Sequence, residues 1–142
     1  MTELTLNKAR VIVRKALAHA QAAGMKPLSI VVLDHGGHPV AFERADGGFP
    51  GGYVVAHGKA YAAVMMGLTG SEFEGIAKQA PNFANNLNEL FGGAMLPVRG
   101  GVLVKNRRGM VIGAVGATGD TSENDVAAAV SGIEAAGFVA AA

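Results

Sequence analysis

The sequence contains no cysteine. This absence excludes disulfide bonds, thiolate metal ligands and cysteine nucleophiles, so stability must come from side-chain packing. Charge is also scarce, because only 16% of the residues are charged and the formal net charge is +1 at pH 7. No strong field of either sign results, so neither nucleic acid nor an anionic membrane surface is expected as a partner.

Long apolar runs are absent as well. No stretch approaches the roughly 20 consecutive apolar residues that a membrane-spanning helix requires. The first residues carry Lys8, Arg10 and Arg14 in an amphipathic pattern, without the continuous apolar segment of a secretory signal. We therefore expect a cytoplasmic protein with no membrane partner.

Apolar side chains and glycine are abundant. Half of the 142 residues are hydrophobic, which is enough for a core at this length, and no Pro/Ser-rich tract divides the chain. We therefore expect one domain over residues 1–142. Many of the 21 glycines fall in two clusters with polar neighbours. Glycine-rich turns between apolar runs often bring the backbone close to a ligand.

The first half of the chain predicts a helix, a hairpin and a second helix. Apolar residues recur at spacings of three and four over residues 5–23, which is the period of a helix with one buried face. The apolar runs at 29–34 and 39–44 are separated by two glycines, the signal of an antiparallel hairpin. A glycine-rich loop at 46–52 then leads into an alanine-rich helix over 53–66.

The middle of the chain has weaker patterns. Ser71 with Glu74 three residues later predicts a capping box and a short helix to Gln79, which Pro81 stops. Residues 82–91 have apolar positions at near-helical spacing but several asparagines among them. Both a weak helix and an ordered loop fit this segment.

The last third predicts a second hairpin and a final helix. The apolar runs at 98–104 and 110–117 are separated by a charged turn, and either Ser122 or Asn124 caps a helix that reaches the end of the chain. Tight hairpins join antiparallel neighbours, whereas parallel strands need long crossovers. The sequence therefore predicts an α+β domain with an antiparallel sheet flanked by helices, not a Rossmann domain.

A first group of candidate functional residues surrounds the first hairpin. Asp34, His35 and His38 lie in the predicted turn, and Glu43 and Asp46 follow it. Imidazoles and carboxylates near one another can perform acid/base chemistry. The same residue types are also common turn residues. We expect no metal site, because the histidines lack helical spacing and no cysteine completes a ligand set.

A second group lies near the start of the middle helix. His57 and Lys59 follow the glycine-rich loop, where backbone N–H groups and the helix dipole favour an anion. The alternative is a solvated lysine and a surface histidine, since the spacing matches no nucleotide-binding pattern.

A third group consists of glycines around the last hairpin. Arg99, Gly100 and Gly101 lie in the first part of one predicted strand, and Gly113, Gly116 and Gly119 occur in and after the next. Glycines at this density permit a flat cofactor or substrate to lie against the backbone. The alternative is a bulged strand before a capped helix, and the glycine spacing does not match a dinucleotide-binding motif.

Taken in order, these segments resemble the GlcG/HbpS family, which also includes the carboxy-terminal domain of PduO-type adenosyltransferases. The likeness extends from Leu4 to about Gly137, and its specificity comes from the order and spacing of several short motifs. The matching segments are residues 4–6, VVLDHGGH at 31–38, AFERADG at 41–47, Lys59-Ala60, PVRGG at 97–101 and IGAVGATG at 112–119, followed by Asp125.

The resemblance implies a profilin-like α-β-α domain, in agreement with the pattern of the residues. It also implies a homo-oligomer, in which dimers build into larger rings or octamers, and haem or a corrinoid as the ligand. The final helix supports the expectation of an oligomer, because residues 126–142 carry very few charges and so large an apolar surface should be covered.

Two functional hypotheses follow. The first is a small-ligand-binding protein that holds haem or a corrinoid. Its expected binding residues are His38, His57, Lys59, Arg99, Gly100, Gly101 and Gly116. The second is a catabolic enzyme that acts on a small organic acid or ring compound by proton transfer. In that case Asp34, Glu43 or Asp46 is the acid or base, and Lys59 or Arg99 binds a carboxylate.

Overall fold

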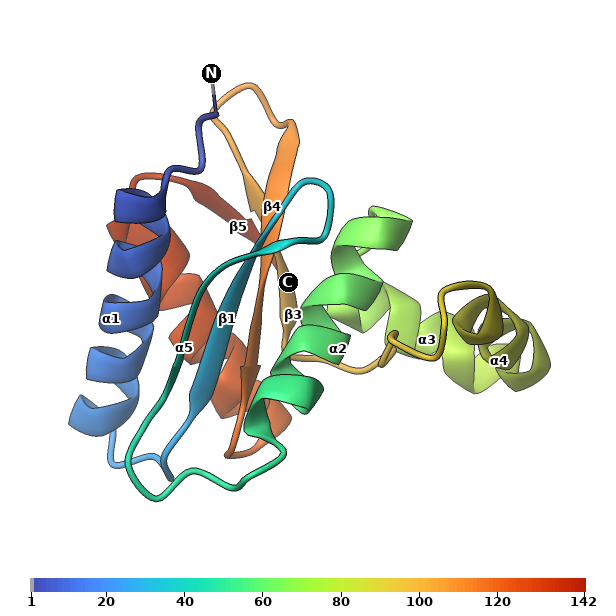
Figure 1. Ribbon diagram of the computed structural model, residues 1–142, viewed down its shortest axis with the longest axis horizontal. Coiled ribbons are helices and arrows are strands. Elements are labelled where there is room, and N and C mark those ends of the chain that lie inside the picture. Colours follow the sequence, from blue (N-terminus) through green and yellow to red (C-terminus); the bar gives the residue numbers. More distant parts are fainter. Residues whose placement is uncertain (1) are drawn as a thin grey trace.

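The chain folds into an antiparallel sheet with helices on both faces (Figure 1). The structure is a computed structural model that describes residues 2–142. The sheet has five strands in the order β2-β1-β4-β3-β5, which confirms the predicted α+β class. In chain order the elements are α1 (Leu6–Ala22), β1 (Ser29–Asp34), β2 (Pro39–Arg44), α2 (Gly52–Met66), α3 (Gly70–Gln79), α4 (Pro81–Leu90), β3 (Gly101–Lys105), β4 (Val111–Thr118), α5 (Ser122–Ala135) and β5 (Val139–Ala141).

Two hairpins form most of the sheet. Strands β1 and β2 make the first, β3 and β4 the second, and both were predicted from the sequence. The hairpins join through β1 and β4, which pair antiparallel from Ser29 with Thr118 to Asp34 with Gly113. This pairing places the start of β1 beside the end of β4, near the starts of α2 and α5.

The prediction that the final helix reaches the end of the chain is wrong. Helix α5 ends at Ala135, the chain reverses at Gly137, and β5 pairs antiparallel with β3. Strand β5 has only three residues, and its alanines fit a helix pattern as well as a strand. Its position is therefore decided by the open edge of β3 and not by local sequence preference.

Several predicted boundaries also need correction. Strand β3 begins at Gly101, not at residue 98. The capping box of α3 consists of Thr69 and Glu72, because the helix starts two residues earlier than the Ser71–Glu74 pattern indicated. Residues 82–91 lie mostly in a regular helix, α4, which Pro81 begins.

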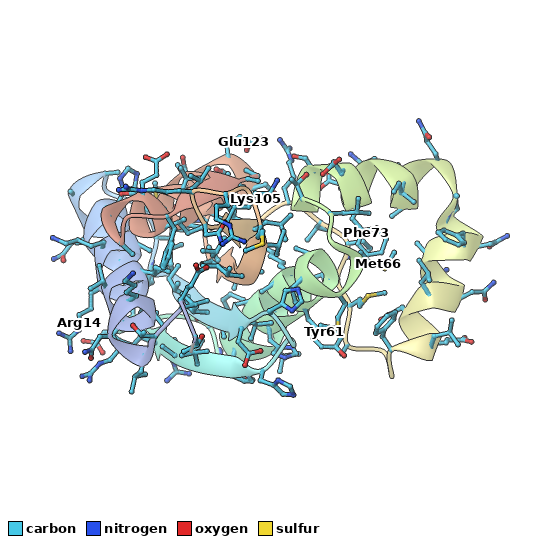
Figure 2. All side chains as sticks on the ribbon, turned by 90° about the horizontal axis from the view of Figure 1, so that it is seen from above. Arg14, Tyr61, Met66, Phe73, Lys105 and Glu123 are labelled. Atoms are coloured by element: carbon cyan, nitrogen blue, oxygen red, sulfur yellow. The ribbon has the colours of Figure 1, made fainter. Side chains whose placement is uncertain are left out.

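The helices form unequal layers on the two faces of the sheet. Helices α1 and α5 pack together on one face, and α2 covers the other (Figure 1). Helices α3 and α4 extend beyond α2, away from the sheet, and we call them the helical arm. Phe73 and Met66 lie between α2 and the helical arm, in a small apolar cluster with Ala62 and Met95 (Figure 2).

The apolar face of α5 is covered within the chain. Gly132 of α5 lies against the backbone carbonyl of Ile12 in α1, and Ala128, Ala129 and Ile133 are fully buried in the core between these helices and the sheet. The apolar composition of this segment therefore no longer supports an oligomer. Among residues 2–142, no helix combines the length and the apolar character needed to cross a membrane.

Candidate functional site

The glycines of the last hairpin lie beneath helix α2. A Cβ at Gly116 would collide with the backbone carbonyl of Ala56, and one at Gly101 would collide with the carbonyl of Lys59. These two glycines therefore allow α2 to approach the sheet through its alanines, as in Ala60 against Gly116. Their surfaces face a helix of the same chain, so the sheet at this point is not the floor of an open pocket.

Lys59 is buried at the end of the sheet and has partners within the chain. Its Nζ atom donates to the backbone carbonyl of Ala117 at 3.0 Å and pairs with Oδ2 of Asp125 at 3.3 Å. The side chains of Lys59 and Asp125 are only 7% and 2% exposed. Gly100 covers this lysine, because a Cβ there would lie 2.9 Å from Nζ. The expectation that Lys59 binds an external anion is therefore wrong in this conformation.

Asp125 links the two faces of the sheet. It lies in the first turn of α5, whereas Lys59 comes from α2 on the opposite face. Burial raises the pKa of the Asp125 carboxyl, and the N–H of Asp120 and the Lys59 ammonium partly oppose that rise. A buried ion pair of this kind matters mainly for the stability of the fold, because loss of one partner leaves the other charge buried and uncompensated.

Arg99 also has partners within the chain. Its guanidinium pairs with Glu123 of α5 at 3.0 Å and approaches Glu74 of α3 at 3.8 Å. Its backbone N–H donates to Glu74 at 2.9 Å, and this bond is the main reason that the pKa of Glu74 is lowered. Arg99 thus ties the helical arm to α5.

His57 lies in a row of aromatic side chains on the outer side of α2. Tyr53, His57 and Tyr61 are spaced four residues apart, with ring centroids 5.7 Å and 5.3 Å apart along the row. Phe42 of β2 continues the row beyond Tyr53 at 4.9 Å, and Phe91 continues it beyond Tyr61 at 6.2 Å. This row was not predicted from the sequence, although the spacing of four between Tyr53, His57 and Tyr61 was a readable signal.

The imidazole of His57 borders an apolar cavity of about 530 Å³. We call this cavity the α2 groove. Helix α2 forms one wall, and residues 93–96, which follow the helical arm, form the other. The lining residues are Tyr53, Val54, Val55, His57, Gly58, Asn88, Gly93, Ala94, Met95 and Leu96.

Two hydrogen bonds fix the second wall of the α2 groove. The N–H of Leu96 donates to the carbonyl of Gly58 at 3.0 Å, and the N–H of Met95 donates to the side-chain carbonyl of Asn88 at 2.9 Å. Burial lowers the pKa of His57 from its ordinary value of 6.5. At neutral pH the imidazole is therefore uncharged, and one of its ring nitrogens has a free lone pair.

The first hairpin turn has a different character. Oδ1 of Asp34 accepts from the N–H groups of Gly36 and His38 at 2.9 Å, and lies 3.3 Å from Nδ1 of His38. The side chain of His38 is 79% exposed. Gly37 at the tip of the turn lies against Tyr61, so the hairpin meets the aromatic row near its far end. Asp34 and His38 have the geometry of a turn and border no apolar cavity with His57.

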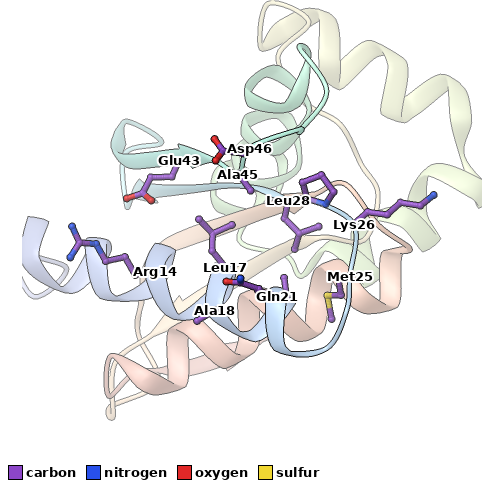
Figure 3. A pocket seen from close by; sticks show the side chains of 12 residues that line it. Arg14, Leu17, Ala18, Gln21, Met25, Lys26, Leu28, Glu43, Ala45 and Asp46 are labelled. Carbon is purple, nitrogen blue, oxygen red and sulfur yellow. The ribbon is translucent and has the colours of Figure 1, made fainter.

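The two other predicted acid/base residues lie elsewhere. Glu43 and Asp46 line a cavity of about 560 Å³ between β2 and the second half of α1 (Figure 3). We call it the α1–β2 pocket. Arg14 of α1 shares it, and the side chains of Leu17 and Leu28 form part of its apolar lining (Figure 3). No ion pair between residues 2–142 involves Arg14, Glu43 or Asp46.

The predicted site residues thus divide into separate places. His57 borders the α2 groove, Glu43 and Asp46 border the α1–β2 pocket, and Asp34 and His38 form a turn. Lys59 and Arg99 are engaged in ion pairs within the chain. Within residues 2–142, no three His, Asp or Glu side chains are grouped as metal ligands.

The architecture and these sites define a single-sheet α+β domain with a histidine beside an apolar groove. The chain belongs to the HbpS-like family, because the model of the family described as "Haem degrading protein HbpS-like" matches residues 4–134. This finding confirms the resemblance that the sequence motifs indicated. No curated protein matches the chain in sequence.

Solved structures support the same relationship. HbpS is 29% identical, with a TM-score of 0.81, over 94% of this chain and 90% of that chain. The haem complex of PduOC is 23% identical, with a TM-score of 0.82, over 96% of each chain. The protein ORFY of Klebsiella pneumoniae is also 23% identical, with a TM-score of 0.82, over 96% of this chain and 92% of that chain. At 23% identity, the last two structures establish the shared fold.

Proposed function

We propose that this protein binds haem in the α2 groove, with the imidazole of His57 as the axial ligand of the iron. The observation that carries the proposal is the uncharged, partly buried imidazole at the border of an apolar cavity. An iron ligand must be deprotonated, and a lowered pKa keeps His57 in that form at neutral pH. Haem supplies the iron and its redox chemistry, while the protein supplies the ligand and the apolar surroundings.

The size and lining of the groove support a flat, mainly apolar ligand. Small-molecule sites commonly have volumes of about 300–1,000 Å³ and are lined by apolar side chains with a few polar groups. The α2 groove fits this description, with Val54, Val55 and Leu96 as apolar walls and the Asn88 amide as a polar group. Gly58 lets the second wall approach α2, because a Cβ there would lie 3.0 Å from the Cβ of Leu96, whereas a Cβ at Gly93 would meet nothing within 4 Å.

Exposed apolar side chains beside the groove support the same proposal. Val54 and Tyr53, which both line the groove, are 72% and 38% exposed. Exposed apolar surface that gathers beside a cavity is typical of ligand sites. The HbpS-like family is described as haem-degrading, and PduOC has been crystallised as a haem complex, so relatives of this chain have been connected with the same ligand.

The experiment is a haemin titration followed by absorption spectroscopy. The wild-type protein should give a shifted, ligated Soret band that saturates, and His57→Ala should lose the ligated band. His38→Ala is the matched control, because it removes another imidazole outside the groove, and it should bind as the wild type does. A ligated Soret band that survives in His57→Ala and disappears in His38→Ala would overturn the assignment of the ligand.

A corrinoid is the alternative ligand, and the same assay separates it from haem. Corrinoids carry many amide side chains, whereas the lining of the α2 groove offers one side-chain amide, that of Asn88. We therefore expect saturable binding of haemin and no spectral change of aquocobalamin on addition of protein. A ligand-exchange shift of aquocobalamin, with none for haemin, would assign the groove to corrinoids.

The α1–β2 pocket supports a second candidate function, which is proton transfer on a small organic acid. Two carboxylates and one guanidinium that form no ion pair border the same cavity, so Arg14 could bind a substrate carboxylate while Glu43 or Asp46 moves a proton. In this candidate function, Arg14 binds the substrate carboxylate, which is the role that the sequence pattern suggested for Lys59 or Arg99. The test is hydrogen–deuterium exchange at the α-carbon of small carboxylic acids, measured by NMR. Exchange that is catalysed by the wild type and lost in Glu43→Gln would support this function, and exchange unaffected by Glu43→Gln and Asp46→Asn would reject it.

A homo-oligomer and a cytoplasmic location remain proposals. Exposed Phe83 and Leu90 on α4, together with Val54 on α2, offer apolar surface for contact between copies. Size-exclusion chromatography with light scattering should give a dimer or a multiple of it, up to an octamer. A monomer at micromolar concentration would contradict the proposed oligomer.

A further inference from the structure

A third cavity lies where the start of α1 meets the end of α5, on the face of the sheet that α1 and α5 cover. It has a volume of about 580 Å³, and three cationic side chains line it. Lys8 comes from the first turn of α1, and Arg107 and Arg108 come from the turn between β3 and β4. Neither the α2 groove nor the α1–β2 pocket includes any of these residues. We call this cavity the basic pocket.

The side chain of Asn106 holds the turn that carries the two arginines. Asn106 is 7% exposed, and its side-chain carbonyl accepts from the N–H groups of Arg108 and Met110, both at 3.0 Å. The N–H of Asn106 donates to the carbonyl of Met110, which closes the turn. The arginines therefore project from a backbone that is fixed before any ligand binds, which reduces the entropy lost on binding.

Lys8 is positioned over an aromatic ring. Its Nζ atom lies 4.8 Å from the ring centroid of Phe138, which is a cation–π contact. Phe138 also lines the basic pocket and is partly buried against the core. A charged group and a flat apolar surface thus stand side by side in one cavity.

The three cations outnumber the acidic residues in the lining of the basic pocket. No ion pair between residues 2–142 involves Lys8, Arg107 or Arg108. The one acidic residue of the lining is Glu3, and its carboxylate already accepts from the side chain of Asn106 at 2.9 Å. Like charges that folding brings together without a partner favour the binding of an anion.

The cations are not needed to cap the end of α5. The carbonyl of Glu134 accepts from the N–H of Gly137 at 2.9 Å, and the carbonyl of Ile133 accepts from the N–H of Phe138 at 3.2 Å. Backbone groups therefore satisfy these final carbonyls of the helix. The basic side chains are available for a ligand from solution.

Thr5 and the start of α1 add donors to the basic pocket. Thr5 caps α1, and its side-chain oxygen accepts from the N–H of Lys8 at 3.2 Å, which leaves the hydroxyl hydrogen free to donate. The positive end of the α1 dipole lies at the same place. Cations, a hydroxyl donor and a helix start together match a compact group with more than one negative charge.

From this arrangement we infer that the basic pocket binds a small phosphate monoester with a flat, apolar substituent. The phosphate lies among Lys8, Arg107 and Arg108, and the substituent packs on Phe138. Arginine and lysine side chains recognise phosphate through charge-assisted hydrogen bonds, which a monocarboxylate uses only in part. This site is independent of the proposed haem site, because the two lie on opposite faces of the sheet.

The test is isothermal titration calorimetry with phenyl phosphate, inorganic phosphate and phenol as probes. Phenyl phosphate should bind the wild type with a Kd of about 1 mM or lower, inorganic phosphate about tenfold more weakly, and phenol not measurably. The double variant Arg107→Ala/Arg108→Ala should weaken phenyl phosphate binding by tenfold or more, on the order expected for lost charged contacts. Phe138→Ala should bring the affinity for phenyl phosphate to that for inorganic phosphate.

The matched control is Arg10→Ala/Lys15→Ala, which removes two exposed cations of α1 that do not line the basic pocket. This control should bind phenyl phosphate as the wild type does. If both double variants weakened phenyl phosphate binding equally, the effect would come from the net charge of the protein, and the proposed site would be overturned. Absence of saturable binding in the wild type would overturn it too, and equal affinities for phenyl phosphate and inorganic phosphate would overturn the role of Phe138. Haemin titrations of these variants should be unchanged, so failure here is distinguishable from failure of the haem proposal.

Discussion

Helix α2 packs directly on glycines of the sheet, whereas the core on the other face also contains branched side chains from α1 and α5. On the α2 face, Ala56 and Ala60 lie directly on Gly116. On the other face, Ile12, Val13 and Ile133 belong to the core between the helices and the strands, together with several alanines.

This difference determines where each face can hold a ligand. The close contact of α2 with the sheet leaves no room between them, so the functional side chains of α2 are those on its outer side, where His57 and the α2 groove lie. On the other face, a cavity lies at the sheet edge, where Glu43 and Asp46 meet α1. The strand glycines thus serve close packing of α2 on the sheet. The proposed ligand site lies beside α2, and not between α2 and the sheet.

The buried pair that links the two faces offers the largest expected effect. Lys59→Met should lower the free energy of unfolding by about 3–5 kcal/mol, because it leaves the Asp125 carboxylate buried without its partner. Denaturant unfolding followed by circular dichroism measures this change. Replacement of both partners, in Lys59→Met/Asp125→Leu, should recover a large part of the loss. A single variant as stable as the wild type would show that the pair does not join the faces.

The contact of α2 with Gly116 provides the next largest effect. Gly116→Val should lower the free energy of unfolding by about 3 kcal/mol, because the new side chain must displace the backbone of α2. Thermal and denaturant unfolding measure the loss. Gly75→Ala is the control, since nothing lies near that position in α3 and alanine favours a helix by about 0.5–1 kcal/mol. A tolerated valine at Gly116 would contradict the close contact on this face.

Ligation by His57 should depend on pH in a defined direction. Protonation of the imidazole competes with iron, and burial places the pKa of His57 below its ordinary value of 6.5. The ligated Soret band should therefore persist as pH falls through 6.5 and disappear only at lower pH. A pH titration of the haemin complex measures the midpoint. Loss of the band above pH 6.5 would contradict ligation by an imidazole with a lowered pKa.

The smallest expected effect tests whether the α1–β2 pocket and the α2 groove act independently of each other. Glu43→Gln, in the α1–β2 pocket, should leave the haemin affinity and the Soret spectrum unchanged, because that pocket lies across the sheet from the α2 groove. Parallel haemin titrations of the variant and the wild type measure this. A clear loss of haemin affinity would move the ligand toward the α1–β2 pocket and contradict the division between the faces.

Much of the fold could be predicted from the sequence because its signals are local. The spacing of apolar residues and the turn residues predicted both hairpins and the first helix, and the family resemblance rested on motifs in those segments. Strand β5 could not be predicted in this way, because three residues join the sheet only through the free edge of β3. The position of a short strand depends on long-range pairing that no local pattern records.

The candidate site was only partly predictable, for a similar reason. His57 could be named from its residue type and its place in a helix. That it shares a cavity with residues 93–96 could not, because this depends on how the helical arm folds back toward α2. Lys59 was misjudged because its partner Asp125 lies 66 positions away in sequence and on the other face. Glycine has two uses in strands, close helix packing and close ligand approach, and the sequence alone does not distinguish them.

A crystal structure of the protein reconstituted with haemin would show directly which side chain and which cavity hold the ligand. We predict iron bonded to the imidazole of His57, with the porphyrin between α2 and residues 93–96. Iron bonded to another side chain, or porphyrin density in the α1–β2 pocket with an empty α2 groove, would contradict this prediction.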